Sequence, residues 1–344
     1  MDWGTLGDMD SVLSCSSPLL GVTTGVEKTN DDATMCKRSA VIRGYYKDPF
    51  LAHFWNRGIS SERKAPEIHL GYYTRVHGLQ TLLEKASVTF GKPVQILNLG
   101  CGYDTLYWRL RSKNHPDTRI SNFVEIDYPS ITSLKLSAIK RSKELLSYLS
   151  EDEIRCSKTD LHASSGYHLL GTDLCGSLEN LDSKLSSQCG IDYDAPTIFL
   201  AECVLIYLDP TKSLALLSWI ADKFSRAVFV HHEQFNMNDR FGRVMLNSLR
   251  SRGTDLPGME YCVSSQTQSN RFLKAGWTGC RTWTMNEVYA EFPPEEISRV
   301  EKLEHLDERE LMSQLFEHYC LAVAWKNPSD THLQIEWDDI DWWN

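Results

Sequence analysis

Two glycines behind an apolar run give this 344-residue chain its clearest chemical signal. Residues 94–99 read Val-Gln-Ile-Leu-Asn-Leu, which is typical of a buried strand, and Gly100 and Gly102 follow before a helix is predicted from Thr105. Because glycine has no Cβ and tolerates positive φ, this turn lets the backbone approach a ligand closely. An ordinary glycine-rich turn without a ligand is the alternative.

The same loop restricts the class of ligand. A dinucleotide fingerprint requires a third glycine where Thr105 stands, and a phosphate-binding P-loop requires a Gly-Lys-Ser/Thr sequence that is absent here. A pyrophosphate is therefore a poorer fit than a nucleoside without phosphates. S-adenosyl-L-methionine is a cofactor of that kind.

Carboxylates at the ends of the following apolar runs support a binding site. Glu125 and Asp127 close the second run, where an acidic residue can accept hydrogen bonds from ribose hydroxyls, and Asp127 is the better placed. Asp173 and Leu174 follow the third run and suit the amine and the flat face of adenine, and Glu202 ends the fourth. Any one of them could be a helix cap or a solvated side chain, but their recurrence at successive strand ends favours a site.

The order of elements predicts the fold class. Short apolar runs alternate with helical segments, a pattern typical of a mostly parallel, doubly wound α/β sheet. A Rossmann-like sheet is expected, with Asp209 and Pro210 starting the helix after the fourth strand. Two later runs are expected to close the far edge as a hairpin-like pair. The predicted strands are 94–99, 122–127, 167–172, 197–203 and 227–231, and the edge pair is 278–284 with 321–325.

Composition excludes several functional classes. The net charge is −10 at pH 7, which argues against a nucleic-acid or anionic-membrane surface. The ten cysteines include no Cys-x-x-Cys pair, and neither a secretory signal nor an apolar stretch long enough to cross a membrane is found. We expect a cytoplasmic protein with reduced thiols that is monomeric and binds neither nucleic acid nor membranes.

Two other chemistries are disfavoured. His231, His232 and Glu233 look like metal ligands, but neighbouring residues of a strand point to opposite faces and no His-Glu-x-x-His spacing follows. A Gly-x-Ser-x-Gly nucleophile motif is also absent. We therefore expect no bound metal.

The chain resembles the leucine carboxyl methyltransferase family from about residue 31 to residue 325. The resemblance is carried by Arg-Lys-Ala-Pro-Glu-Ile at 63–68, Gly-Tyr-Tyr-Thr-Arg-Val-His-Gly at 71–78, the glycine loop at 98–105, and Ala-Glu-Cys-Val-Leu-Ile-Tyr at 201–207. Further matches are Lys-Arg at 37–38, Gly-Tyr with Asp-Pro-Phe within 44–50, and residues 233–242. It implies methyl transfer from S-adenosyl-L-methionine to the α-carboxylate of the C-terminal leucine of the protein phosphatase 2A catalytic subunit, which regulates assembly of the phosphatase holoenzyme.

Composition and periodicity predict a tail at 1–30, expected to be disordered, and a helical cap at 31–88. The resemblance identifies the alternating strands and helices at 89–330 as a methyltransferase domain, whereas the acidic aromatic tail at 331–344 has no match in the family. The resemblance implies no general base, with Arg75 and Tyr207 lining the active site. The positions that match the family's cofactor-binding residues are Lys37, Arg75, Gly100, Asp127, Asp173, Leu174 and Glu202.

Departures from the family pattern leave other functions open. His69-Leu70 replaces a common Asn-Arg pair, and Cys101 replaces a more usual alanine. A small-molecule carboxylate O-methyltransferase of the same family and a non-catalytic phosphatase-binding module are the alternatives. The similar wybutosine-forming tRNA methyltransferases carry an added repeat domain for which this chain has no room, and they would suit a more basic protein.

Overall fold

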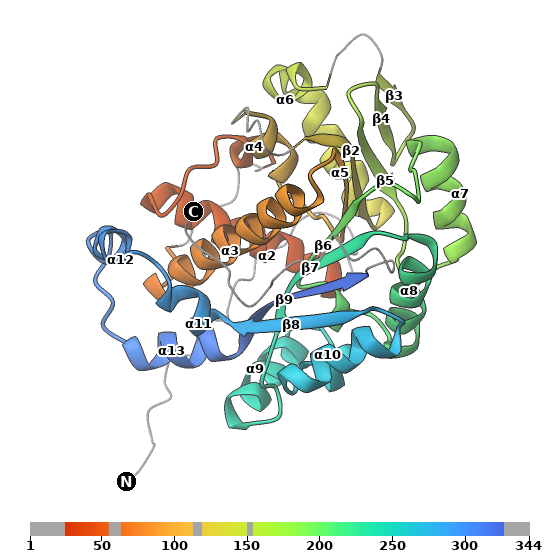
Figure 1. Cartoon of the computed structure of the whole chain (residues 1–344). Helices are drawn as coiled ribbons and strands as arrows, with labels where there is room; N and C mark the ends of the chain where they lie inside the picture. Colours follow the sequence, from red (N-terminus) through yellow and green to blue (C-terminus); the bar gives the residue numbers. More distant parts are fainter. Residues whose placement is uncertain (1–24, 55–62, 113–118, 150–153, 327–344) are drawn as a thin grey trace.

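A twisted sheet forms the centre of the protein in the computed structural model, which describes residues 25–54, 63–112, 119–149 and 154–326 (Figure 1). Within these residues the sheet has nine strands in the order β3-β4-β5-β2-β1-β6-β7-β9-β8. The neighbours from β5 to β7 pair in parallel, and the pairs at both edges are antiparallel. The strands are β1 (Val94–Leu99), β2 (Ile120–Asp127), β3 (Ile154–Cys156), β4 (Leu161–Ala163), β5 (Tyr167–Gly171), β6 (Thr197–Glu202), β7 (Ala227–Gln234), β8 (Gly279–Thr284) and β9 (Tyr319–Lys326).

Helices connect the strands and cover both faces of the sheet. The α-helices are α2 (Gly25–Arg43), α3 (Pro66–Phe90), α4 (Leu106–Ser112), α5 (Pro129–Arg141), α6 (Lys143–Ser147), α7 (Leu178–Cys189), α8 (Pro210–Lys223), α9 (Arg240–Ser251), α10 (Ser265–Lys274), α11 (Met285–Ala290), α12 (Pro294–Glu301) and α13 (Arg309–Glu317). Short 3-10 turns are η1 (Phe50–Phe54), η3 (Leu205–Tyr207) and η4 (Pro257–Cys262).

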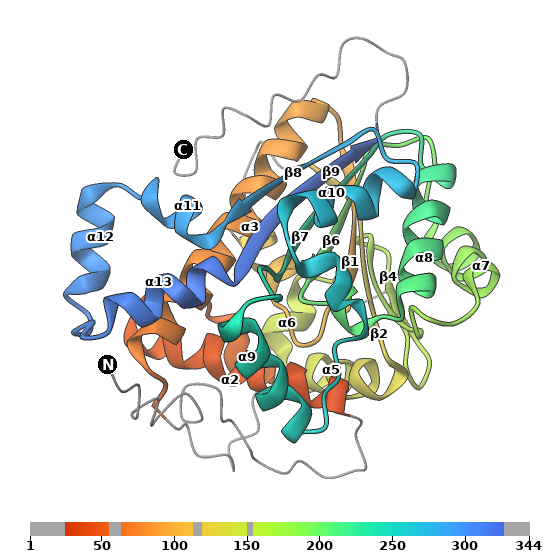
Figure 2. The ribbon, with the colours of Figure 1, turned by 90° about the horizontal axis from the view of Figure 1, so that it is seen from below.

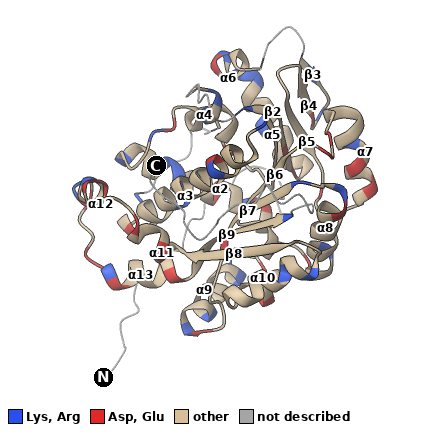
Figure 3. Ribbon diagram, viewed as in Figure 1, with Lys and Arg blue, Asp and Glu red and all other residues tan. Residues whose placement is uncertain are grey.

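Alternation along the strands divides the core into two layers. Ile96 packs with α3, α4 and α5 on one face, whereas its neighbour Leu97 packs with α7, α8 and α10 on the other. Successive side chains of a strand point to opposite faces, so strands that are apolar at almost every position must be covered on both sides. Acidic and basic residues are interspersed on the surrounding helices, and the strands are mostly uncharged (Figure 3).

The predicted strands and edge pair are confirmed. β1, β2, β5, β6 and β7 occupy the five predicted runs, and β8 pairs with β9 in antiparallel fashion at the far edge. The side chain of Asp209 accepts hydrogen bonds from the backbone N–H groups of Thr211 and Lys212 and caps α8, as expected. The short strands β3 and β4 at the opposite edge were not predicted.

The N-terminal boundary differs from the prediction. Helix α2 begins at Gly25, so residues 25–30 are helical rather than part of a disordered tail. The Thr254 hydroxyl donates to the carbonyl of Gly25, and Arg252 lies 3.6 Å from Asp32, which places the start of α2 against the end of α9 (Figure 2). These tertiary contacts hold the first turn of α2, which lies before the predicted start of the cap at residue 31. Residues 1–24 and the predicted tail at 331–344 lie outside the described residues.

Two expectations about the chain's environment can be compared with the structure. The nine cysteines within the described residues are all free. No helix in the described part of the chain is long and apolar enough to cross a membrane.

Candidate active site

A cavity of about 280 Å³ lies at the carboxyl ends of β1, β2, β5 and β6. This is the edge at which open α/β sheets bind ligands. Helices α2 and α3 form one wall, and residues of η3, α9 and β9 form another. The cavity therefore lies between the predicted cap and the carboxyl edge of the sheet.

The glycine loop after β1 forms part of the cavity wall and needs both of its glycines. Gly100 has φ of +62°, and a Cβ there would lie 2.6 Å from Cγ2 of Val204. Gly102 has φ of +47°, and a Cβ there would lie 2.5 Å from the side-chain oxygen of Asn30. That oxygen accepts a hydrogen bond of 2.8 Å from the backbone N–H of Tyr103. Helix α2 thus holds the loop directly, a role for Asn30 that sequence reasoning missed.

Asp127 lies at the end of β2 beside this loop. Its carboxylate accepts hydrogen bonds of 2.7 Å from the backbone N–H groups of Gly102 and Tyr128. Burial raises the pKa of Asp127, and the two N–H donors oppose that rise. The Asp127 side chain therefore lines the cavity and also holds the glycine loop that forms part of the cavity wall. The position of Asp127 in the sequence does not reveal this second role.

Glu202, Lys37 and Arg75 meet in the cavity from three distant parts of the chain. Lys37 of α2 donates to Oε2 of Glu202 at 2.8 Å, and the Nε–H of Arg75 in α3 donates to Oε1. The three side chains are between 10 and 11% exposed. Burial would raise the pKa of Glu202, but the charges of Arg75 and Lys37 hold it well below its usual range. A second carboxylate, that of Asp104, lies 3.9 Å from Lys37, so the two cations are balanced by two nearly buried acidic groups.

The other predicted residues are placed as follows. Leu174 and Tyr207 line the cavity. Asp173 is exposed, does not line the cavity, and accepts a 2.9 Å hydrogen bond from the backbone N–H of Cys175. Asp173 thus lies beside the site without contributing to its wall.

A cluster around Cys203 was not foreseen. Cys203 has φ of +56°, a conformation that costs a non-glycine residue free energy and is frequent at functional sites. Its sulfur lies 3.2 Å from Nδ1 of His232, whose ring stacks on Tyr319 with centroids 5.2 Å apart. All three residues line the cavity. The sequence places Cys203 just after β6, His232 within β7 and Tyr319 at the start of β9, but no local motif links the three residues.

The groups of this cluster and Tyr207 are uncharged near neutral pH. Burial raises the pKa of the Cys203 thiol to about 12, and burial raises the pKa of Tyr207 well above its usual value. Burial together with Arg75 lowers the pKa of His232 far below its ordinary value. The adjacent His231 packs against Phe272 in the core instead, which confirms that the two histidines point to opposite faces.

Comparisons with known proteins agree with this arrangement. Residues 26–221 match the family model "Leucine carboxyl methyltransferase". Leucine carboxyl methyltransferase 1 of Bos taurus is 42% identical over 328 residues (94% of this chain, 96% of the relative), and that of Caenorhabditis elegans is 40% identical over 307 (87% and 90%). The human tRNA wybutosine-synthesizing protein 4 is 36% identical over 319 residues, covering 90% of this chain and 45% of the relative.

The fold is also found in solved structures. A protein of the DUF574 family from Streptomyces avermitilis superposes with a TM-score of 0.51 at 12% identity, covering 86% of this chain and 97% of the other. The predicted class, a Rossmann-like methyltransferase sheet with added N-terminal helices and C-terminal edge strands, is confirmed. Sequence identity above 40% across nearly the whole chain then decides the relationship, and the protein is a member of the leucine carboxyl methyltransferase family, an enzyme family of carboxyl methyltransferases.

Proposed function

We propose that this protein uses S-adenosyl-L-methionine to methylate the α-carboxylate of the C-terminal leucine of the protein phosphatase 2A catalytic subunit. The observation that carries the proposal is the Lys37–Glu202–Arg75 group in a cavity at the carboxyl edge of a methyltransferase sheet. Lys37 and Arg75 are nearly buried in this cavity, and two such cations can hold and orient the methionine carboxylate of the cofactor beside an acceptor carboxylate.

The cavity residues fit the cofactor. Gly100 and Gly102 have no side chains, so the backbone of their loop can approach a ligand in the cavity closely. Asp127 has carboxylate oxygens with further lone pairs for ribose hydroxyls, and Leu174 provides an apolar surface for adenine. Lys37 and Arg75, balanced by Glu202, are the cations for the methionine carboxylate, whereas Asp173 does not line the cavity and leaves the adenine to Leu174. The cofactor supplies an electrophilic methyl group on a sulfonium centre.

The reaction needs orientation and exclusion of water rather than proton transfer. An α-carboxyl group has a pKa of about 3.5, so it is already an anion at pH 7. The protonated thiol of Cys203, the neutral ring of His232 and the neutral phenol of Tyr207 can line the site without accepting a proton. Helices α2 and α3, which we assign to the cap, then serve to enclose the site and to supply Lys37 and Arg75.

A terminal leucine requires an apolar subsite for its side chain. Met245, Leu249, Leu315 and Phe316 line the same cavity and form its apolar side. Burying one leucine side chain contributes about 1.5–3 kcal/mol, whereas a micromolar complex requires about 8 kcal/mol. Recognition must therefore include surface contacts beyond the tail. Arg63, which is 66% exposed beside Glu304, is a candidate for the rim.

The test measures methyl transfer from labelled S-adenosyl-L-methionine to three acceptors. These are the intact phosphatase catalytic subunit, a peptide of its C-terminal tail, and the same peptide with an amidated end. We expect a base-labile methyl ester on the phosphatase, a much lower kcat/KM on the free peptide, and no turnover on the amidated peptide, because amidation removes the nucleophile. Equal rates on peptide and phosphatase would favour a generic carboxylate methyltransferase. Cofactor binding without any ester would favour a binding module.

A further inference from the structure

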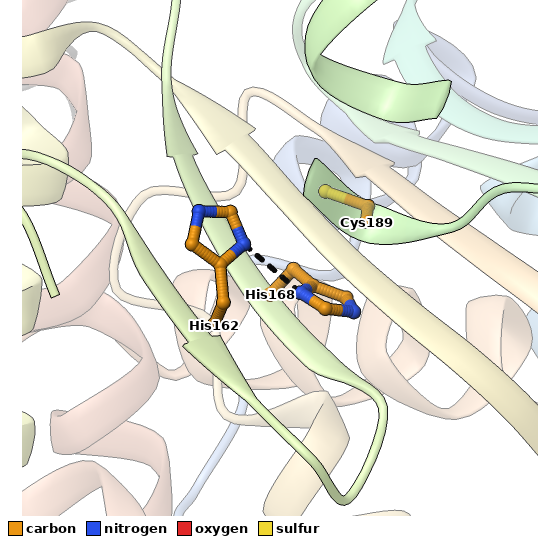
Figure 4. Close-up of side chains that lie close together, drawn as sticks. All are labelled: His162, His168 and Cys189. Carbon is orange, nitrogen blue, oxygen red and sulfur yellow. Dashed lines mark hydrogen bonds between the residues drawn. The ribbon is translucent and has the colours of Figure 1, made fainter. Parts of the chain in front are cut away.

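Three potential metal ligands lie together at the β4–β5 hairpin, next to the edge strand β3 (Figure 4). His162 of β4 and His168 of β5 are directly opposite in the antiparallel register, and their Nδ1 atoms are 3.1 Å apart. Cys189 comes from the last turn of α7. One ligand atom of each residue lies within 4.8 Å of those of the other two.

This cluster is separate from the candidate active site. None of its residues lines the cavity, which lies at the carboxyl ends of the parallel strands. His168 is the second residue of β5 and is therefore near the amino end of that strand. A ligand held here would act on the sheet edge and on α7 rather than on methyl transfer.

The geometry is close to that of a tetrahedral metal site. With Zn–N bonds of about 2.0–2.1 Å and a Zn–S bond of about 2.3 Å, tetrahedral angles require an N···N separation of about 3.3 Å and an N···S separation of about 3.6 Å. The Nδ1 atoms of the two imidazoles are 3.1 Å apart, which is within about 0.2 Å of the required N···N separation. The sulfur lies at most 4.8 Å from the ligand nitrogens, so each N···S separation must shorten by no more than about 1.2 Å to meet the second.

The surroundings keep the two histidines in the neutral form that binds metals. Burial lowers the pKa of His168 to about 4 and lowers the pKa of His162, so both rings keep a free nitrogen lone pair near neutral pH. Burial raises the pKa of the Cys189 thiol to about 12, so the thiol is protonated without a metal and must lose its proton when it binds one. The charged groups around the rings are Arg155, Lys184 and Asp160, and Lys184 is paired with Asp160 at 3.4 Å.

We propose that His162, His168 and Cys189 bind a zinc-type divalent transition-metal ion. Two imidazole nitrogens and one thiolate are the ligand set that such ions prefer, and half-buried His162 leaves a fourth position for water. Binding replaces the S–H bond of Cys189 by a metal–sulfur bond, and the thiol proton passes to solvent. The ion joins β4 and β5 to the end of α7 and thereby stabilises this edge of the sheet.

The direct test adds Co²⁺ to the full-length protein in the absence of S-adenosyl-L-methionine. We expect thiolate-to-cobalt charge-transfer absorption and the intense visible bands of tetrahedral cobalt, both saturating at one equivalent. Zn²⁺ should displace the cobalt, and Zn²⁺ alone should raise the melting temperature. A wild-type protein with no charge-transfer band and no zinc-dependent shift would overturn the proposal, and would leave the two histidines as a simple hydrogen-bonded pair. Because no methyl transfer is measured, this outcome is independent of the proposed function.

Matched variants assign the site. Cys189→Ser and His162→Asn should each remove the cobalt band and weaken zinc binding by more than the roughly 10- to 100-fold typical for loss of an outer-shell group. Cys156→Ser replaces an exposed thiol of the neighbouring strand β3 and should change neither quantity. If Cys189→Ser does not fold by circular dichroism, His162→Asn still decides, since its side chain is only half-buried. A band that persists in His162→Asn, or disappears in Cys156→Ser, would place the metal elsewhere.

Discussion

Replacing Asp127 by alanine should weaken cofactor binding and protein stability together, because the carboxylate serves both. In the cofactor-free protein it accepts backbone hydrogen bonds from Gly102 and Tyr128. Each hydrogen bond to a charged group contributes about 1.5–3 kcal/mol to stability. Burial of the carboxylate, which raises the pKa of Asp127, offsets part of the contribution of the two hydrogen bonds. We therefore expect Asp127→Ala to lower the free energy of unfolding by about 2–4 kcal/mol.

The effect on the cofactor is measured separately. Loss of a carboxylate contact to ribose costs a further ~1.5–3 kcal/mol, or roughly ten- to a hundredfold in affinity. The assays are urea unfolding without ligand and calorimetric titration with S-adenosyl-L-methionine under conditions where each variant is fully folded. Asp127→Asn keeps one acceptor oxygen, so its stability should fall between the wild type and alanine.

A second carboxylate provides the matched control. Asp209 also accepts two backbone N–H groups, those of Thr211 and Lys212, but it lies outside the cavity. Asp209→Ala should lower stability by about 0.5–2 kcal/mol, as loss of a helix cap does, without changing cofactor affinity. The reasoning is refuted if folded Asp127→Ala binds the cofactor as tightly as the wild type, or if Asp209→Ala loses as much affinity.

Two further substitutions test the site, and a third, at Gly91, serves as a control. Glu202→Gln removes the carboxylate that pairs with Arg75 and Lys37 and leaves Lys37 with Asp104 alone, at 3.9 Å, so it should cost about 3–5 kcal/mol at pH 7. Because the pKa of Glu202 is lowered in the folded protein, the carboxylate stabilises the fold above the ordinary glutamate pKa, and this contribution is lost as the pH falls toward the folded-state pKa. In urea unfolding, the stability difference between the wild type and Glu202→Gln should therefore narrow below about pH 4. A difference that does not depend on pH would contradict this. Gly100→Ala should lower the free energy of unfolding by about 2–5 kcal/mol, because the cost of a positive φ adds to the clash with Val204. Gly91→Ala, where φ is +58° and the new Cβ meets open space, should lower it by only about 1–2 kcal/mol. Equal losses in thermal unfolding would show that the contact with Val204 is unimportant.

The sequence by itself determined the central sheet and much of the site. The central strands have five to eight residues and are buried on both faces, so each appears in the sequence as a continuous apolar run. These runs locate β1, β2, β5, β6 and β7 correctly. Parallel strands bring their carboxyl ends to one edge, so Gly100, Asp127, Leu174 and Glu202 could be placed together from chain position alone. Lys37 and Arg75 were identified by resemblance to the family rather than by any local pattern.

Only the tertiary structure decided the features that depend on distant contacts. β3 and β4 have three residues each, too few for a periodic signal, and they form because β5 offers a free edge to pair with. The early start of α2 depends on contacts with the end of α9, more than 200 residues away.

The electrostatics of the site are likewise a tertiary property. The pairing of Glu202 with Lys37 joins residues 165 positions apart, and the pKa of the carboxyl follows from that pairing. Cys203 and His232 are adjacent because β6 and β7 are neighbours in parallel register, and His162, His168 and Cys189 meet because a hairpin packs beside the end of α7. A linear pattern records residue types and local spacing, whereas charge interaction and burial depend on distances in space, which only the folded chain sets.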